Sequence, residues 1–155
     1  MVERFMREAI ALSLENVRSG RGGPFGAIVV RGGEVIGRGA NSVTALNDPT
    51  AHAEVLAIRA ACQALGAFEL PDCEIYSSCE PCPMCLGAIY WARMRRYYYA
   101  NTRADAARAG FDDSRIYDEF AKSPELRTVP GSQFVIEGAA EALEEWVRWG
   151  AKVPY

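Results

Sequence analysis

One histidine and two cysteines constrain the fold of this chain more than any other feature of its sequence. His52 is the only histidine, and it lies in the run Thr50-Ala51-His52-Ala53-Glu54. Cys82 and Cys85 follow 30 residues later (82 − 52), in the run Pro81-Cys82-Pro83-Met84-Cys85. An imidazole and two thiolates are donors that zinc prefers, and three protein donors leave the fourth position of a tetrahedral site open. Any fold of this chain must therefore bring two distant segments to one point.

Both ligand segments are predicted to lie at the starts of helices. Asp48-Pro49-Thr50 offers cap and first-turn residues for a helix near 51–65, which Gly66 would end. Pro81 is expected to open a second helix that runs through Arg93. The apolar positions of the first helix predict its buried face: Val55, Ile58, Cys62 and Leu65. Because a helix N-terminus lowers the pKa of a thiol, this placement favours the thiolate that a metal ion needs.

Glu54 lies two residues after the histidine and is not needed as a ligand. A zinc centre with two thiolates and one imidazole is close to neutral overall, and it can make a bound water titrate towards neutral pH. Glu54 is then the natural carrier that takes a proton from the water and delivers it to a ring nitrogen and a leaving amine. The pattern therefore predicts hydrolytic chemistry at one zinc ion per chain.

Other interpretations of the same residues stay open. Cys79 could complete a closed Cys3His structural site, and a Cys-x-x-Cys pair can also serve redox chemistry. The His-x-Glu run and the proline before Cys82 favour the open catalytic site over both. A zinc-stabilised interaction module without catalysis is the non-enzyme alternative. In such a module, Glu54→Ala would keep zinc and fold, with no chemistry to lose.

The size and charge of the chain exclude several classes of protein. Its 155 residues, half of them hydrophobic, suffice for a single domain over 1–155. The net charge of −3 argues against a nucleic-acid partner, although Arg93, Arg95 and Arg96 lie close together. We find no apolar run of membrane-spanning length and no signal peptide, so no membrane partner is expected. Five cysteines without a secretion signal indicate reduced thiols in the cytoplasm.

Helices and strands are predicted to alternate along the rest of the chain. The hydrophobic periodicity predicts an amphipathic helix over 2–18, a β-hairpin from Phe25–Val30 and Glu34–Ala40, and strands over 73–78, 95–100 and 133–136. Short helices are expected over 104–131. A last helix near 139–149 would bury Leu143, Trp146 and Val147. This order predicts an α/β sandwich around a mostly buried sheet.

The motifs of this chain resemble those of the cytidine deaminase superfamily. His-x-Glu followed by Pro-Cys-x-x-Cys is the signature of its zinc deaminases, and here the second motif extends over SCEPCPMCLGAIYWAR, 78–93. Three further segments are similar to its bacterial guanine deaminase branch: GGPFGA at 22–27, GANSVTALNDPTAHAE at 39–54 and AGFDDSRIY at 109–117. The resemblance covers nearly the whole chain and is weakest over 120–150. The metal motif is specific to the superfamily only, and AGFDDS after the second motif is what points to guanine.

The resemblance implies both a fold and a reaction. The fold is a cytidine deaminase-like three-layer sandwich, with a five-stranded mixed sheet flanked by helices and the first strand antiparallel to most others. The reaction is hydrolytic deamination of guanine, a small purine base, to xanthine and ammonia. His52, Cys82 and Cys85 match the zinc ligands of the family, and Glu54 matches its proton shuttle. Cys79 stands where related deaminases commonly carry an apolar residue.

Asn41, Phe25, Ala53 and Asp113 are candidate contacts for the base. Asn41 can donate and accept, which suits a purine edge, but it could equally make a hydrogen bond at a turn. Phe25 could stack on the ring, although a Phe after Gly-Gly-Pro is more often a core residue. Asp113 could accept from guanine N1–H or act as a second proton carrier, and only its AGFDDS context raises it above a loop or cap residue.

Trp91 and Tyr155 are the remaining candidates for the substrate site. Trp91 belongs to an aromatic cluster that favours core or subunit interface, and it could also form a pocket wall. Tyr155 matches the terminal position of guanine deaminases whose C-terminal segment closes over the active site, in some from the partner subunit. We therefore expect a homodimer with this segment near the partner's active site. The functional alternatives are a tRNA adenosine deaminase and a deaminase of guanosine, cytosine or an aminotriazine.

Overall fold

A computed structural model describes residues 2–155 and divides the chain into two compact units, one that ends at Asp113 and one over Ser114–Tyr155. No helix among the described residues has the length and apolar character needed to cross a membrane. The expectation of a single domain over 1–155 stays a prediction.

A four-stranded sheet forms the centre of the first unit. The strands β1 (Gly26–Arg31), β2 (Glu34–Ala40), β3 (Cys73–Cys79) and β4 (Arg96–Asn101) lie in the order β2-β1-β3-β4. β1 pairs antiparallel with both β2 and β3, whereas β3 and β4 are parallel. The predicted hairpin is confirmed, because Gly32 and Gly33 take positive φ angles of 58° and 88°, as a type I′ turn requires.

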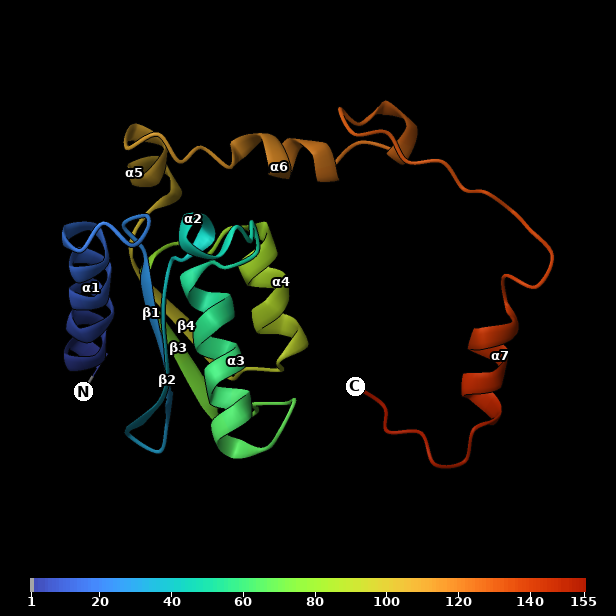
Figure 1. Cartoon of the computed structure of the whole chain (residues 1–155), viewed down its shortest axis with the longest axis horizontal. Coiled ribbons are helices and arrows are strands. Elements are labelled where there is room, and N and C mark those ends of the chain that lie inside the picture. The colour runs from blue at the N-terminus through green and yellow to red at the C-terminus, as the bar shows by residue number, and fades with distance from the viewer. Residues whose placement is uncertain (1) are drawn as a thin grey trace. The chain divides into compact units, whose positions relative to one another are not determined.

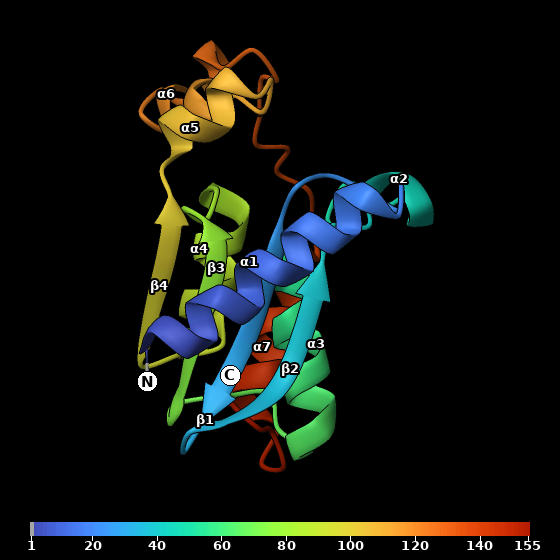
Figure 2. The same cartoon turned by 90° about the vertical axis from the view of Figure 1, so that its left-hand side faces the viewer.

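Helices cover both faces of this sheet and make three layers (Figures 1 and 2). α1 (Val2–Arg18) packs on one face, as the periodicity predicted, and α3 (Ala53–Leu65) and α4 (Pro83–Trp91) pack on the other. The short α2 (Val43–Leu46), which the sequence did not indicate, precedes α3, and α5 (Arg103–Arg108) follows β4. The predicted mixed sheet between helices is therefore confirmed for this unit.

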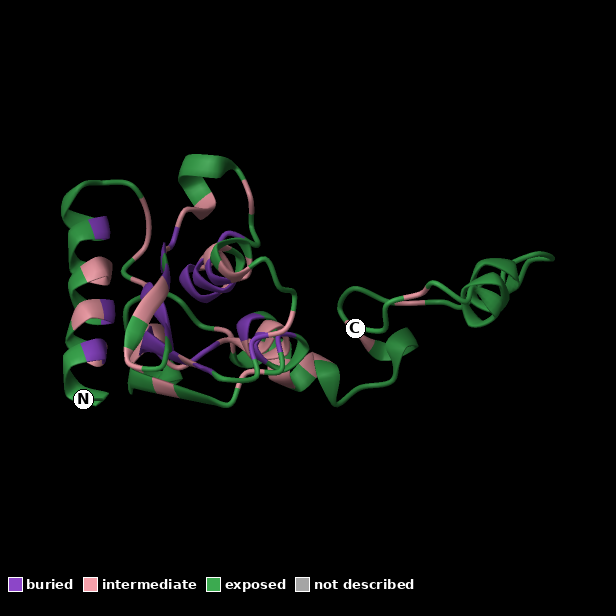
Figure 3. Ribbon diagram, turned by 90° about the horizontal axis from the view of Figure 1, so that it is seen from below, coloured by how far each residue is buried: buried purple, intermediate pink, exposed green. Residues whose placement is uncertain are grey.

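The side chains of β1 alternate between two hydrophobic clusters. Ala27 and Val29 pack with residues of α3 and α4, whereas Ile28 and Val30 pack with Phe5 and Ala9 of α1. Figure 3 shows the buried residues gathered on the strands and on the sides of the helices that face them.

The face that α3 buries differs from the prediction. It consists mainly of alanines: Ala53, Ala57 and Ala61, with Ile58 and Glu54. Of the residues predicted for this face, Ile58 is buried, Cys62 and Leu65 are partly buried against the core, and Val55 is only partly buried. Small side chains replace large ones because α3 lies very close to β2. A Cβ atom built on Gly39 would stand 2.6 Å from Ala57 N and closer still to Ala53 O.

The second unit contains α6 (Ser114–Phe120), the 3-10 helix η1 (Pro124–Leu126) and α7 (Glu141–Arg148). The short helices over 104–131 and the last helix are thus confirmed. The predicted strand over 133–136 is wrong, so the sheet of the described residues has four strands and not five. This segment pairs with no neighbouring strand, and its side chains are uncovered, with Phe134 and Val135 85% and 82% exposed. The predicted burial of Leu143, Trp146 and Val147 is also wrong, since all three are exposed.

Candidate metal centre

The two ligand segments lie at helix starts, and each helix begins two residues later than expected. His52 is the N-cap of α3 and Cys82 is the N-cap of α4, both with extended backbone angles. Asp48 does not cap α3, because its Oδ1 accepts from Thr50 N and Thr50 Oγ1 at 2.8 and 2.7 Å and so closes a turn of its own. Cys85 lies in the first turn of α4 and is buried. The N-termini of α3 and α4 therefore hold all three predicted ligands.

The three donor atoms form a compact triangle. Cys82 Sγ lies 3.5 Å from His52 Nδ1 and 3.5 Å from Cys85 Sγ, and Cys85 Sγ lies 3.4 Å from His52 Nδ1. Tetrahedral zinc with Zn–S near 2.3 Å and Zn–N near 2.0 Å places ligand atoms about 3.5 to 3.8 Å apart. The triangle thus has the size and the chemistry of a three-donor zinc site, with Nδ1 as the histidine donor.

The electrostatics of the triangle also suit a cation. A hydrogen bond from Cys85 lowers the pKa of the Cys82 thiol well below its usual range, and the same bond raises the pKa of Cys85. Two adjacent thiolates repel each other, so a single proton is shared between them until a cation compensates their charge. The pKa of His52 is raised, chiefly by its hydrogen bond with Cys82. A divalent cation would take the place of the shared proton and leave the imidazole neutral.

Glu54 lies beside the triangle, and its carboxyl group is almost completely buried. Ser77 Oγ donates to Glu54 Oε1 at 2.9 Å, and Cys85 Sγ lies 3.4 Å from Glu54 Oε2. Burial is the main cause that raises the pKa of Glu54, while the Ser77 hydrogen bond acts in the opposite direction. A carboxyl group next to a metal site, with its protonated form favoured by burial, is suited to take up and release protons during a reaction.

Cys79 does not join the triangle. Its buried Sγ lies 3.5 Å from the backbone oxygen of Thr102, and burial raises its pKa to about 11. Among the described residues, the cluster of donor atoms close enough together to hold one metal ion consists of His52, Cys82 and Cys85. This arrangement favours an open site with three protein ligands over a closed Cys3His site.

Asn41 lies where β2 ends and is nearly buried. Its Oδ1 accepts from Gly23 N and Val43 N at 3.3 and 3.4 Å. The expected hydrogen bond at a turn therefore engages the oxygen of the side-chain amide. The Nδ2 group remains to donate. Asn16 of α1, which the sequence did not single out, donates from its buried Nδ2 to Asn41 O and Gly23 O at 2.8 Å each. In the sequence, Asn16 could have been noticed as a polar residue on the otherwise apolar face of the amphipathic helix over 2–18.

Two phenylalanines adjoin the segment that carries Asp113. Phe25 packs against the core cluster next to α3, and its ring meets that of Phe111 edge to face with centroids 4.9 Å apart. Asp113 is half-buried, and its pKa is raised by burial first and then by the charge of Cys82. Asp113 is therefore within electrostatic reach of the triangle. Phe111, which was not predicted, joins Phe25 to this segment.

The other predicted contacts occupy different positions. Ala53 is fully buried at the first position of α3, between His52 and Glu54. Trp91 is the last residue of α4, at the opposite end from Cys82, and is 68% exposed. Tyr155 belongs to the second unit and is 71% exposed. The roles of Trp91 and Tyr155 at the substrate site stay predictions.

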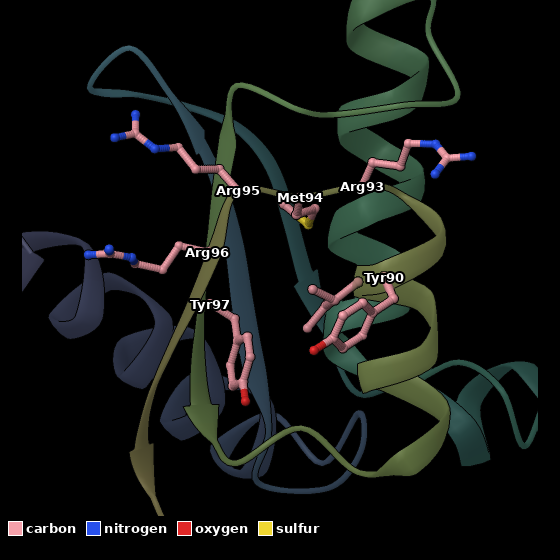
Figure 4. A pocket seen from close by; sticks show the side chains of 7 residues that line it. Tyr90, Arg93, Met94, Arg95, Arg96 and Tyr97 are labelled. Carbon is pink, nitrogen blue, oxygen red and sulfur yellow. The ribbon is translucent and has the colours of Figure 1, made fainter.

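A hollow of about 500 Å³ lies at the C-terminal end of α4 and shares no residue with the triangle. It is lined by Ile89, Tyr90, Arg93, Met94, Arg95, Arg96 and Tyr97. Figure 4 shows that Arg93 extends away from Arg95 and Arg96, while Tyr90 and Tyr97 lie below them. Arg93 is paired with Glu69 at 2.5 Å. The arginines therefore do not form one continuous basic face.

The family of this chain follows from comparison with known proteins. Residues 1–101, which include the whole triangle and Glu54, match the cytidine and deoxycytidylate deaminase zinc-binding region. The chain belongs to this deaminase family. The match confirms the prediction of a zinc-dependent enzyme of this superfamily.

Three relatives indicate where in this deaminase family the chain lies. It is 52% identical to the guanine deaminase of Bacillus subtilis (strain 168) over 99% of this chain and 98% of that protein. The X-ray structure of that enzyme matches with a TM-score of 0.97 over the same shares. The tRNA-specific adenosine deaminase of Agrobacterium fabrum is 42% identical over 81% of this chain and 80% of that protein. The structure of NE0047 in complex with 2,6-diaminopurine is 35% identical, covers 73% of this chain and 63% of that one, and has a TM-score of 0.70.

Proposed function

We propose that this deaminase removes the 2-amino group of guanine by hydrolysis, with xanthine and ammonia as products. The reaction type rests on one observation, the convergence of His52, Cys82 and Cys85 beside the buried Glu54. The choice of base is supported by the resemblance to a guanine deaminase, which extends over the C-terminal segment as well as the metal motif.

Glu54 carries the protons in this proposal. When bound, zinc supplies the Lewis acidity that lowers the pKa of a water nucleophile towards neutrality. Glu54 accepts a proton from the attacking water and delivers it to a ring nitrogen, and a second transfer releases the amine as ammonia. Because its burial favours the protonated form, Glu54 can hold the proton between these transfers. Neither thiol needs to take part, since Cys82 and Cys85 serve as ligands.

Asn41, Phe25, Ala53 and Asp113 would bind and orient the base. The Oδ1 of Asn41 is already engaged by backbone N–H groups, so its Nδ2 would donate to an acceptor of guanine, O6, N3 or N7. Phe25 would supply an aromatic wall, and Ala53 would contact the base through its backbone at the start of α3. Asp113 would accept from N1–H or act as the second proton carrier, which its proximity to Cys82 supports.

Guanine is favoured over its rivals by charge and by shape. A tRNA substrate calls for a basic surface, whereas this chain has a net charge of −3 and its clustered arginines diverge. Guanosine would need room for its ribose, which a C-terminal segment that closes over the base would take up. The relatives that act on tRNA also match a smaller part of the chain.

An ammonia-release screen of the zinc-loaded protein tests this proposal. Guanine, guanosine, cytosine, adenine and tRNA are supplied separately, with Glu54→Ala as the matched variant. We expect ammonia from guanine alone, and a variant that keeps one zinc per chain without releasing ammonia. Activity on another substrate without activity on guanine would overturn the choice of base, while ammonia from the variant would overturn the role of Glu54.

We also propose a homodimer in which the C-terminal segment of each chain lies near the partner's active site. In this proposal Tyr155 and Trp91 contact the guanine base. No residue over 114–155 is buried, yet this unit carries many apolar side chains that favour a covered position. The aromatic side chains of Tyr90 and Trp91 are exposed in the same way on α4. On this proposal, residues 1–155 form one deaminase domain that is complete only in the dimer.

Complementation between two inactive variants tests this assembly. One variant carries Glu54→Ala and the other lacks residues 150–155, and the two are unfolded and refolded together. If the segment acts in the partner's site, each mixed dimer holds one complete site, and about a quarter of wild-type activity returns for random pairing. No recovery in mixtures that sedimentation shows to contain mixed dimers would overturn the shared site, and a monomeric wild type would overturn the dimer.

We further propose a cytoplasmic location. All five cysteines are free thiols in the structure, and Cys82 and Cys85 must stay reduced to bind zinc. Fractionation of expressing cells would find the protein in the cytoplasmic fraction, and recovery from another fraction would contradict the proposal.

A further inference from the structure

We infer that Ser77 is a positioning residue for proton transfer: its hydroxyl group holds one oxygen of Glu54, so that the other oxygen serves the reaction. The inference rests on the proposed deamination, in which Glu54 carries the protons. Ser77 lies on β3, 23 residues from Glu54 in sequence, and neither of the two motifs singles it out as a ligand or carrier.

The hydrogen bonds around Ser77 define where its proton points. The side chain is 1% exposed, and its Oγ donates to Glu54 Oε1 at 2.9 Å. The backbone N–H of Cys79 approaches the same Oγ at 3.5 Å, on its accepting side. A hydroxyl group has one proton to donate, and here the buried carboxylate is its acceptor. Ser77 therefore reaches Glu54 through a single directed bond, out of contact with solvent.

This bond makes the two oxygens of Glu54 different. Oε1 is tied to the sheet through Ser77, whereas Oε2 lies 3.4 Å from Cys85 Sγ, a candidate zinc ligand. Of the two oxygens, Oε2 is therefore the one on the side of the candidate metal ligands, and it is not the oxygen that Ser77 holds. Ser77 thus assigns Oε2, the oxygen beside the metal ligands, to proton transfer.

The strand that carries Ser77 gives the bond a rigid anchor. β3 is paired on both sides, antiparallel with β1 and parallel with β4, as the strand order in Figure 2 shows. The last torsion of a glutamate side chain is broad and without a strong preference of its own. A directed bond to a central strand removes this freedom. Catalysis requires this restriction, because proton transfer needs a defined geometry.

Three variants separate positioning from support of the fold. Ser77→Ala removes the hydroxyl group, and Ser77→Thr keeps it. Ser78→Ala is the matched control, because Ser78 is also buried on β3, but its Oγ accepts from Gly26 N at 3.0 Å and does not contact Glu54. For each variant we would measure kcat and KM with guanine, the zinc content and the melting temperature, alongside the wild type.

We expect Ser77→Ala to lower kcat by about 10 to 100-fold, with KM changed by less than about 3-fold and one zinc retained. Ser77→Thr should restore kcat to within about 5-fold of the wild type, and Ser78→Ala should keep it. An active wild type together with equal kcat in Ser77→Ala and Ser78→Ala would overturn the role of Ser77. Loss of zinc from Ser77→Ala would overturn it too, since the effect would then lie on the ligands.

A second measurement separates this inference from the proposed reaction. If the wild type releases no ammonia from guanine, the proposed function fails, and melting temperatures then test Ser77 alone. Ser77→Ala should lower Tm by about 5 °C in the wild type, because a buried carboxylate loses a donor. In the Glu54→Ala background the same substitution should lower Tm by less than about 2 °C. Equal shifts in the two backgrounds would show no coupling and overturn the inference without any substrate.

Discussion

Gly39→Ala should damage catalysis through the start of α3, at a distance from every reacting group. A Cβ atom at position 39 would lie 2.6 Å from Ala57 N and nearer to Ala53 O, both backbone atoms that no side-chain rotation can move aside. Ordinary contact begins at 3.4 Å, so the helix must retreat by at least 3.4 − 2.6 = 0.8 Å, and by more at Ala53. Ala53 lies between His52 and Glu54, so this retreat displaces a ligand and the proton carrier together. A misplacement near 1 Å costs about 100-fold in rate.

Gly37→Ala is the matched control, because it meets the same helix one turn further from the metal centre. Its Cβ would lie 2.8 Å from Ala61 N and nearer to Ala57 O. Both substitutions overpack the same interface and should each cost about 1–3 kcal/mol of unfolding free energy, measured by urea denaturation. We expect kcat/KM for guanine to fall about 100-fold in Gly39→Ala and less than about 5-fold in Gly37→Ala. Equal losses of activity at equal losses of stability would refute the argument from position along α3.

Three further predictions follow from the site. Removal of zinc with a chelator should lower Tm by about 5–10 °C in a way that added zinc reverses, because the ion binds only the folded protein; an unchanged Tm would speak against the triangle as a zinc site. Cys79→Val should keep one zinc per chain by elemental analysis and lower kcat by less than about 5-fold, whereas loss of the ion would indicate a fourth ligand. Asn41→Asp keeps an oxygen for the two backbone N–H groups but removes the Nδ2 donor, so KM for guanine should rise about 100-fold or more while Tm changes little; an unchanged KM would remove Asn41 from the base site.

The residues of the metal centre could be found from sequence because the requirement is chemical. A zinc ion needs nitrogen and sulfur donors, and a single histidine leaves little choice among candidates. Both helices begin two residues later than predicted because local signals compete. Asp48 has the chemistry of a cap, but it closes its own turn with Thr50, and α3 begins only after His52.

Contacts between residues far apart in the sequence were harder to predict than the helices and strands themselves. Nothing in a run of strand residues reveals that Ser77 faces Glu54, because only the packing of α3 on β3 brings them together. The apolar residues over 133–136 and on α7 predicted burial, and this prediction was wrong for the described chain, because a hydrophobic pattern does not say which surface would cover it. Their exposure in the described chain shows that a hydrophobic pattern and a strand are separate predictions, since a strand also needs a neighbouring backbone.

The positions of His52 and Cys82 as N-caps link metal supply to the durability of the enzyme. An N-cap is usually Ser, Thr, Asp or Asn, whose side chain satisfies an N–H group of the first turn, and neither His52 nor Cys82 makes such a bond. These two helices therefore begin without the usual side-chain support, and the ion that joins their ends would substitute for it. In a cell short of zinc, the first turns of α3 and α4 would fray first, and proteases could then cleave the chain there. Catalytic competence and survival of the chain would then decline together, so that inactive protein does not accumulate.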